Sequence, residues 1–78
     1  MRILREFSFS DQIKASLFAW NGKFILKLES GNLEQTYKIS ETDVSGEAEV
    51  LDFCRQDEFR KAVAQTFDTM EGFWPPDF

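Results

Sequence analysis

Histidine and cysteine, the side chains that most often do acid–base or covalent chemistry near neutral pH, are scarce in this 78-residue chain. It contains no histidine, which removes the usual general base near neutral pH and the commonest metal ligand. Its single cysteine, Cys54, follows Phe53 in an apolar stretch, whereas a reactive thiol needs exposure and a cationic neighbour. We therefore interpret Cys54 as a buried core residue. Without a glycine-rich phosphate loop, a serine-based triad or a Cys-x-x-Cys motif, the sequence predicts a protein that is not an enzyme and has no cofactor.

One acidic segment has a pattern that could bind a metal ion. From Glu41 onward, oxygen-bearing side chains alternate along the chain, with Gly46 at the sixth position and a carboxylate at the twelfth, which resembles an EF-hand calcium loop. The first and last carboxylates depart from that pattern, and a predicted strand leads into the segment. We therefore expect no metal site and interpret the segment as an acidic loop in which Ser45 caps a following helix, with a calcium loop as the alternative. The candidate calcium ligands are Glu41, Asp43, Ser45 and Asp52.

Tight turns indicate the architecture that must position any functional side chain. Asn21-Gly22 lies between two alternating apolar runs and is the strongest short-range hairpin signal, and Gly31-Asn32 gives a second two-residue loop. Residues 10–12 can close a further hairpin as a three-residue loop. Together with the alternation of apolar residues, these loops predict an antiparallel meander. Its four strands are expected at residues 2–9, 13–20, 23–30 and 33–40.

Counting along the strands from the turns predicts which side chains share a face. Leu17 falls beside Leu26 on a face that we interpret as the core face. A three-residue first loop places Phe9 beside Ile13 and points Arg5 inward, so we expect Arg5 at a margin of the sheet. The other inward positions of the last three strands are Ala15, Ala19, Phe24, Leu28, Tyr37 and Ile39.

The spacing of apolar residues becomes helical in the second half of the chain. A stripe at steps of three and four predicts a helix over residues 57–71 that covers the core face, with Gly72 as its stop. Residues 47–55 are interpreted as a short separate helix, with a fifth strand as the alternative. The fold class is therefore α+β: a four-stranded antiparallel β-meander followed by a short helix and a C-terminal helix packed on one sheet face. We expect a single domain over residues 1–78, with an aromatic tail at 72–78.

The opposite face of the predicted sheet is more apolar than solvent exposure requires. Leu4, Phe18 and Ile25 are expected in one cross-strand row, with Trp20 in the next. Such a row suggests that another surface covers it. The residues expected at this interaction face are Leu4, Phe18, Trp20 and Ile25 as apolar anchors, with Lys23, Lys27 and Lys38 as the polar rim.

Three binding partners are compatible with this face: the C-terminal tail at 73–78, a second copy of the chain, and nucleic acid. Four antiparallel strands followed by a helix, with one face open, resemble in topology the Pur-alpha-type and Whirly-type single-strand-binding folds. The resemblance is of topology only; separately, aromatic rings on a sheet can stack on bases, as Phe18 and Trp20 would, while the lysines contact phosphates. However, residues 41–78 hold three basic and ten acidic side chains, a balance of −7. We therefore expect a homodimer or another protein partner, with single-stranded nucleic acid as the alternative.

A second resemblance covers most of the chain. The stretches at 20–24 and 31–41, with the Phe-rich terminal helix ending near Met70, look like small uncharacterised bacterial single-domain proteins. This resemblance implies a self-standing domain and transfers no functional residue. The lone cysteine cannot form an internal disulfide, and no leader or membrane segment is predicted, so we expect a cytoplasmic protein.

Overall fold

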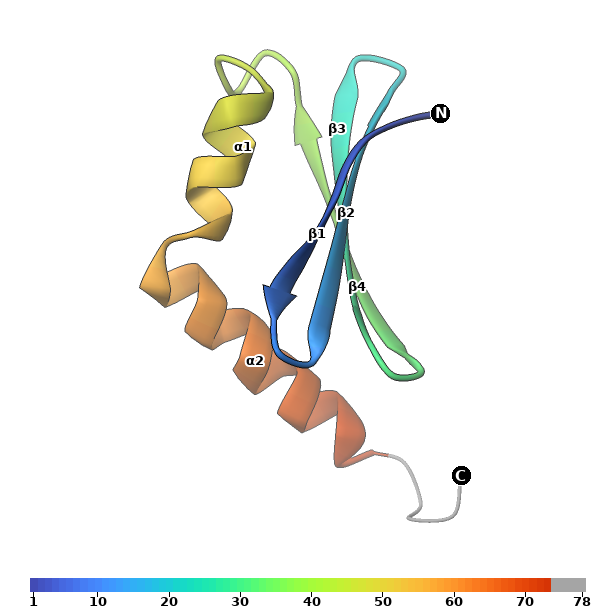
Figure 1. The fold of residues 1–78 in the computed structure, drawn as a ribbon, viewed down its shortest axis with the longest axis vertical. Helices are drawn as coiled ribbons and strands as arrows, with labels where there is room; N and C mark the ends of the chain where they lie inside the picture. The colour runs from blue at the N-terminus through green and yellow to red at the C-terminus, as the bar shows by residue number, and fades with distance from the viewer. Residues whose placement is uncertain (74–78) are drawn as a thin grey trace.

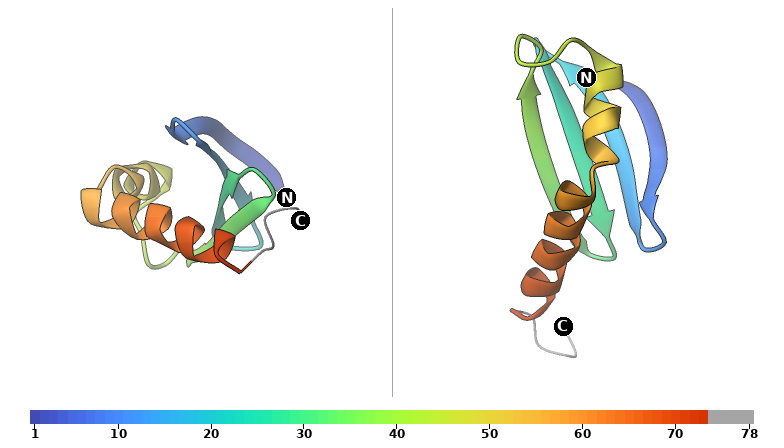
Figure 2. Two further views of the ribbon diagram at one scale, coloured as in Figure 1. Left: turned by 90° about the horizontal axis from the view of Figure 1, so that it is seen from below. Right: turned by 90° about the vertical axis from the view of Figure 1, so that its left-hand side faces the viewer.

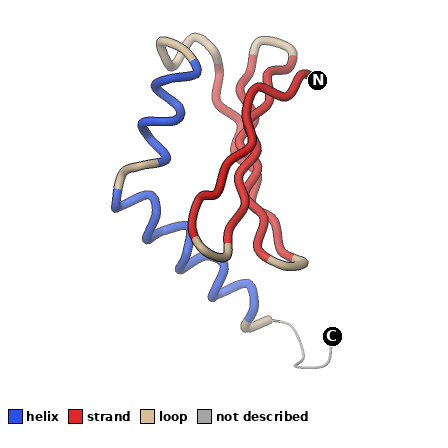
Figure 3. The backbone as a smooth tube through the Cα atoms, viewed as in Figure 1, coloured by secondary structure: helices blue, strands red, loops and turns tan. Residues whose placement is uncertain are grey.

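The computed structural model describes residues 1–73 as an antiparallel sheet with two helices against one of its faces (Figure 1). The elements are β1 (Arg2–Ser10), β2 (Ile13–Trp20), β3 (Lys23–Ser30), β4 (Leu33–Ser40), α1 (Glu47–Cys54) and α2 (Asp57–Glu71). The strands are neighbours in chain order, β1-β2-β3-β4. Figure 3 shows the strands in red, joined by short loops, with the two helices on one side. The predicted α+β meander is confirmed, and the short segment after the sheet is a helix rather than a fifth strand.

The two glycine-containing turns set the register as predicted. Asn21 and Gly22 both have positive φ, 54° and 76°, which gives a type I′ turn, whereas only Gly31 (φ 60°) is positive in the next turn, as a type II′ turn requires. Both turn types match the twist of the strands that they join. The resulting pairs include Leu17 with Leu26 and Leu26 with Tyr37, so the predicted inward positions of β2, β3 and β4 are confirmed.

The pairing of β1 with β2 differs from the prediction near the start of the chain. Ile3 pairs with Phe18, but the next pair joins Arg5 to Leu17, so a β-bulge inserts Leu4. Leu4 packs against the core, and its predicted place in the outer row beside Phe18 is wrong. A count from the loops cannot detect such an inserted residue. Ile3 therefore occupies the position that the sequence assigned to Leu4.

A second bulge lies at the other end of β1. Ser8 pairs with Lys14, and Ser10 pairs with Ile13 across a two-residue turn, which leaves Phe9 as the inserted residue. The predicted pairing of Phe9 with Ile13 is therefore wrong. Phe9 still faces the core, where only 3% of it is exposed. The bulge thus preserves the burial of this aromatic ring while shifting the strand pairing.

The core lies between the sheet and the helices, which cross the same face in both views of Figure 2. The helical stripe contributes Val63 (0% exposed) and Phe67 (4% exposed), while Phe59 and Met70 pack against them at the margin. Burial of this stripe confirms its predicted function as the cover of the sheet. The buried residues of the core are Phe9, Ile13, Ala15, Leu17, Phe24, Leu26, Leu28, Leu33, Val50, Cys54, Val63 and Phe67.

Polar and aromatic contacts fasten the helices to the strands. The side-chain amide of Gln35 donates a hydrogen bond to the carbonyl of Val63, 3.1 Å away, from a buried position on β4. The Arg60 guanidinium lies over the Phe9 ring, 4.7 Å from its centroid, and donates to the Phe9 carbonyl. Phe59 contacts the Phe9 ring edge-on at 5.9 Å. These contacts fix the orientation of α2 across the sheet.

The helix boundaries agree with the sequence to within one residue. The chain turns between the two helices at Gln56, which is extended (φ −71°, ψ 132°), and Gly72 is the C-cap of α2. The Gly72 N–H donates to the carbonyls of Asp68 and Thr69 in the last turn. Across residues 1–73, neither helix combines the length and apolar character that crossing a membrane requires.

Candidate functional site

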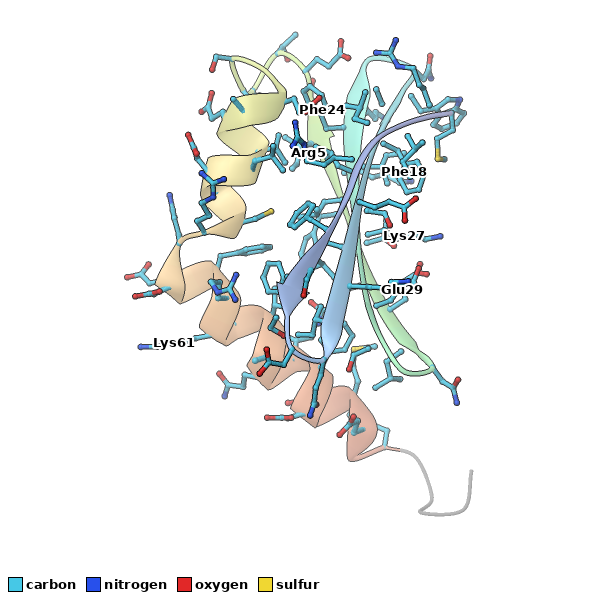
Figure 4. The ribbon with its side chains drawn as sticks, in the orientation of Figure 1. Arg5, Phe18, Phe24, Lys27, Glu29 and Lys61 are labelled. Atoms are coloured by element: carbon cyan, nitrogen blue, oxygen red, sulfur yellow. The ribbon has the colours of Figure 1, made fainter. Side chains whose placement is uncertain are left out.

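The face of the sheet opposite the helices, here called the outer face, carries the predicted interaction residues other than Leu4. Figure 4 shows Phe18, Lys27 and Glu29 projecting from it, whereas Arg5 and Phe24 project toward the helices. This division follows from the strand register, because successive side chains along a strand point to opposite faces. The predicted assignment of Phe18 to the outer face and of Phe24 to the core is therefore confirmed.

An apolar patch, formed by Ile3, Phe18, Trp20 and Ile25, occupies one end of the outer face. The register aligns Ile3, Phe18 and Ile25 in one row across three strands, and Trp20 begins the next row. Ile3 is 48% exposed and Trp20 is 50% exposed, whereas Ile25 is only 6% exposed. Ile25 therefore lies at the base of the patch, and the side chains available for contact are those around it. Ile3 is the residue that the sequence analysis missed, because it lies one position before the bulge.

The three predicted rim lysines differ in their surroundings. Lys23 and Lys38 border the apolar patch in the strand register, where they pair with Trp20 and Ile25. Lys27 lies one row farther along and forms an ion pair with Glu34, with 3.6 Å between nitrogen and oxygen. Only Lys23 and Lys38 are thus placed to form a polar rim around the patch.

Acidic side chains share the outer face with the lysines. A shallow hollow of about 560 Å³ on this face is lined by Glu6, Lys14 and Glu29 together with Ile3 and Phe18. The outward position of these glutamates could have been predicted from the strand register, because the residues on either side of an inward side chain face outward. The outer face therefore carries charges of both signs beside the apolar patch.

The candidate calcium ligands are not gathered into one site. Within residues 1–73, no group of three or more carboxylate or cysteine side chains is arranged to hold a metal ion, so Glu41, Asp43 and Asp52 do not form one. Asp52 lies on α1, where its Oδ1 accepts a hydrogen bond from Arg55 Nη1 at 3.3 Å. The structure thus favours the interpretation of this segment as an acidic loop that leads into α1.

Ser45 connects that loop to α1, but not as the predicted N-cap. The N-cap is Gly46, which makes no side-chain capping bond. Instead, the hydroxyl and the backbone N–H of Ser45 both donate to Oε2 of Glu49, each at 2.6 Å. These two hydrogen bonds, with the hydroxyl as the larger cause, lower the pKa of the Glu49 carboxyl. The carboxylate therefore closes the loop onto the first turn of the helix.

Cys54 is a core residue, as predicted. It is 3% exposed at the end of α1. Burial raises the pKa of its thiol, and the nearby positive charge of Arg60 offsets this only in part. A thiol that stays protonated inside the core is a poor nucleophile, so Cys54 contributes packing rather than covalent chemistry.

The predicted aromatic tail, 72–78, mostly falls outside the described residues. Of that tail the structure describes Gly72 and Phe73, and Phe73 is 78% exposed. Whether residues 74–78 cover the outer face therefore stays a prediction from the sequence.

Comparison with protein-family models, curated proteins and solved structures finds no match to this chain. The features of the structure that bear on its function are the apolar patch, the two lysines beside it and the mixed charges of the outer face.

Proposed function

We propose that this chain is a small non-enzymatic interaction protein that self-associates through the outer face of its sheet. The observation that carries the proposal is the apolar patch, in which Ile3 and Trp20 are each about half exposed beside Phe18. Exposed apolar side chains gathered in one place, with charged residues around them, are typical of protein interfaces. A two-fold axis through the patch would bring the same surface of two copies together.

The composition of the patch suits a contact between proteins. Tryptophan is among the residues that contribute most to binding when buried at the centre of an interface. Burial of apolar area contributes about 25 cal/mol per Å², so covering Ile3, Phe18 and Trp20 would stabilise the assembly. Lys23 and Lys38 border these side chains and would remain at the hydrated rim.

The size of the chain is a second reason to expect partner burial. A domain of 78 residues buries a smaller share of its surface than a larger one, and so its own core adds little margin over chain entropy. Contact with a second copy adds buried apolar area without lengthening the chain. Stability that rises with protein concentration would follow from such coupling.

Binding of single-stranded nucleic acid through the same face is the second candidate. It is favoured by the half-exposed Trp20 ring beside Lys23, since an aromatic ring can stack on a base while a lysine contacts phosphate. The glutamates of the outer face weigh against it, because Glu6, Glu29 and Glu34 would repel the phosphate backbone. We therefore rank it below self-association.

The test is the mass of the protein in solution, measured by sedimentation equilibrium from about 1 to 100 μM. We expect a dimer or larger assembly that Phe18→Asp shifts toward smaller species with the fold intact, because a charge would be buried at the contact. Gln65→Asp adds the same charge at an exposed position of α2 and should leave the mass unchanged. A wild-type monomer over this whole range, or equal effects of the two variants, would overturn the proposal.

The same proteins distinguish the nucleic-acid candidate. Titration of a fluorescent single-stranded oligonucleotide at low salt should give no binding if the outer face contacts protein. Binding that weakens steeply with salt and is lost in Trp20→Ala would replace our proposal with the second candidate.

A further inference from the structure

The strand β4 forms a free edge of the sheet, since no strand lies beyond it among residues 1–73. The backbone N–H of Glu41 donates to the carbonyl of Gly22, and alternate pairs in an antiparallel ladder exchange hydrogen bonds. Odd-numbered residues of β4 therefore bond to β3, and the N–H and C=O groups of Glu34, Thr36 and Lys38 point to the free edge. In the right view of Figure 2, β4 forms the margin of the sheet and α1 lies over the strands inside it.

The sequence of β4 is self-complementary around Thr36. In an antiparallel pair of two β4 strands with Thr36 on the two-fold axis, Glu34 of each copy lies opposite Lys38 of the other. All three pairs, Glu34–Lys38, Thr36–Thr36 and Lys38–Glu34, join residues whose backbone groups point to the free edge. Each pair can exchange two main-chain hydrogen bonds, and opposite charges meet in two of the three.

The other side chains of the strand also match in this arrangement. Leu33 would lie opposite Ile39 of the second copy, which pairs two apolar residues on the helix side. Gln35 would lie opposite Tyr37, but these side chains already hydrogen-bond to each other within one chain, so this pair adds no bond between the copies. The segment from Leu33 to Ile39 is thus complementary to a second antiparallel copy of itself: acid faces base at positions 34 and 38, and apolar residues face each other at positions 33 and 39.

Neighbouring registers lose this complementarity. A shift of the pairing by two residues, which keeps the hydrogen-bonding groups aligned, places Lys38 opposite Thr36 and Glu34 opposite Ser40 in one direction. In the other direction, Lys38 faces Asn32 and Glu34 faces Thr36. Neither arrangement makes an acid–base pair, so only the register centred on Thr36 is favoured by charge.

We propose that a second copy of this chain pairs antiparallel with β4 about a two-fold axis at Thr36 and so extends the sheet across both copies. This contact lies at the edge of the sheet and is separate from the proposed contact through the outer face. If both form, each copy uses two different surfaces, and assemblies larger than a dimer result. If the outer-face contact fails, the edge contact alone gives a dimer.

The decisive experiment uses charge exchange in the Phe18→Asp background, where the outer-face contact is disabled. Glu34→Lys alone and Lys38→Glu alone each place like charges opposite each other twice, so each should sediment as a monomer where the Phe18→Asp parent is a dimer. An equimolar mixture of the two should form a heterodimer, since acid meets base at both positions. A monomeric parent, homodimers of either variant, or a mixture without heterodimer would overturn the proposal.

A disulfide test reports on the register directly. Residues in a hydrogen-bonded antiparallel pair have Cα atoms about 5.5 Å apart, within the range that a disulfide spans. Thr36→Cys should therefore form a covalent dimer on mild oxidation, while the native Cys54 is buried. Glu34→Cys is the matched control on the same face, because its two copies would be separated by about four residues of strand, roughly 14 Å. Equal cross-linking of the two variants, or none at Thr36→Cys, would contradict the predicted register.

Discussion

Phe24 and Phe18 lie on adjacent strands of one sheet, but their environments differ. Phe24 faces the helices and is 8% exposed, whereas Phe18 faces outward and is only partly buried by its neighbours in the sheet. Both strands alternate in the same way, and both faces include large apolar residues. The difference teaches that the core of this protein is defined by the helical cover. The same alternation leaves the outer patch without a cover among the described residues.

The two edges of the sheet offer a second contrast. β1 carries two bulges, at Leu4 and Phe9, which interrupt the ladder and direct extra side chains into the core. β4 pairs with β3 without interruption over its whole length. Bulges are a common way to block further strand pairing at an edge, so β1 is protected in a manner that β4 is not.

The largest expected change in stability comes from a charge on the core face of the sheet, compared with the same charge on the outer face. Phe24→Asp buries an unpaired carboxylate in the core and should cost about 4 kcal/mol or more in unfolding free energy, enough to unfold most of a marginal domain. The Phe18→Asp variant should stay folded, with a far-UV circular dichroism spectrum like that of the wild type. If the two variants unfolded equally, the contrast between the faces would be lost.

The next effect concerns the polar link between the sheet and α2. Gln35→Leu keeps the size of the side chain but removes the donor to Val63 and the acceptor for the Tyr37 hydroxyl. We expect a loss of about 1–3 kcal/mol in urea denaturation, because buried polar groups lose their partner. Tyr37→Phe, which leaves the bond to Val63 in place, is the control and should cost less unfolding free energy. Equal costs for the two variants would contradict this prediction.

A smaller effect is expected at the margin of the helix side. Arg5, which the sequence placed at a sheet margin, forms an ion pair there with Glu47 of α1 at 3.2 Å. Both side chains are partly exposed, so a double-mutant cycle of Arg5→Ala and Glu47→Ala should give a coupling of about 0.2–1 kcal/mol. The coupling should shrink in high salt, and a salt-independent value would show that solvent does not screen the pair.

The smallest effect lies in the loop before α1. The pKa of Glu49 is lowered in the folded protein, so the ionised carboxylate stabilises the fold at pH values above the ordinary glutamate pKa. This contribution to folding stability is lost as pH falls through the lowered pKa. Ser45→Ala removes the larger cause and should raise the Glu49 pKa in an NMR titration. Thr42→Ala, in the same loop, should leave that pKa unchanged, and an unchanged value in Ser45→Ala would refute the assignment.

Part of the site follows from local rules that the sequence carries. Asn21-Gly22 and Gly31-Asn32 permit few backbone conformations, so they fix the pairing of β2, β3 and β4 and place Phe18 and Trp20 on the outer face. The helical stripe likewise identified the cover, because its period of three to four residues matches one face of a helix. The prediction failed where no local rule applies, as at Leu4.

What the sequence by itself determined is the order of the elements, the register of three strands and the identity of the helical stripe, because each depends on neighbours in the chain. Tertiary structure alone decided the bulges of β1, the placing of Ile3 rather than Leu4 in the apolar patch, and the bond from Ser45 to Glu49. A bulge is stable when its extra side chain gains burial against distant residues. That gain depends on where the helices lie, and a count along one strand does not contain it.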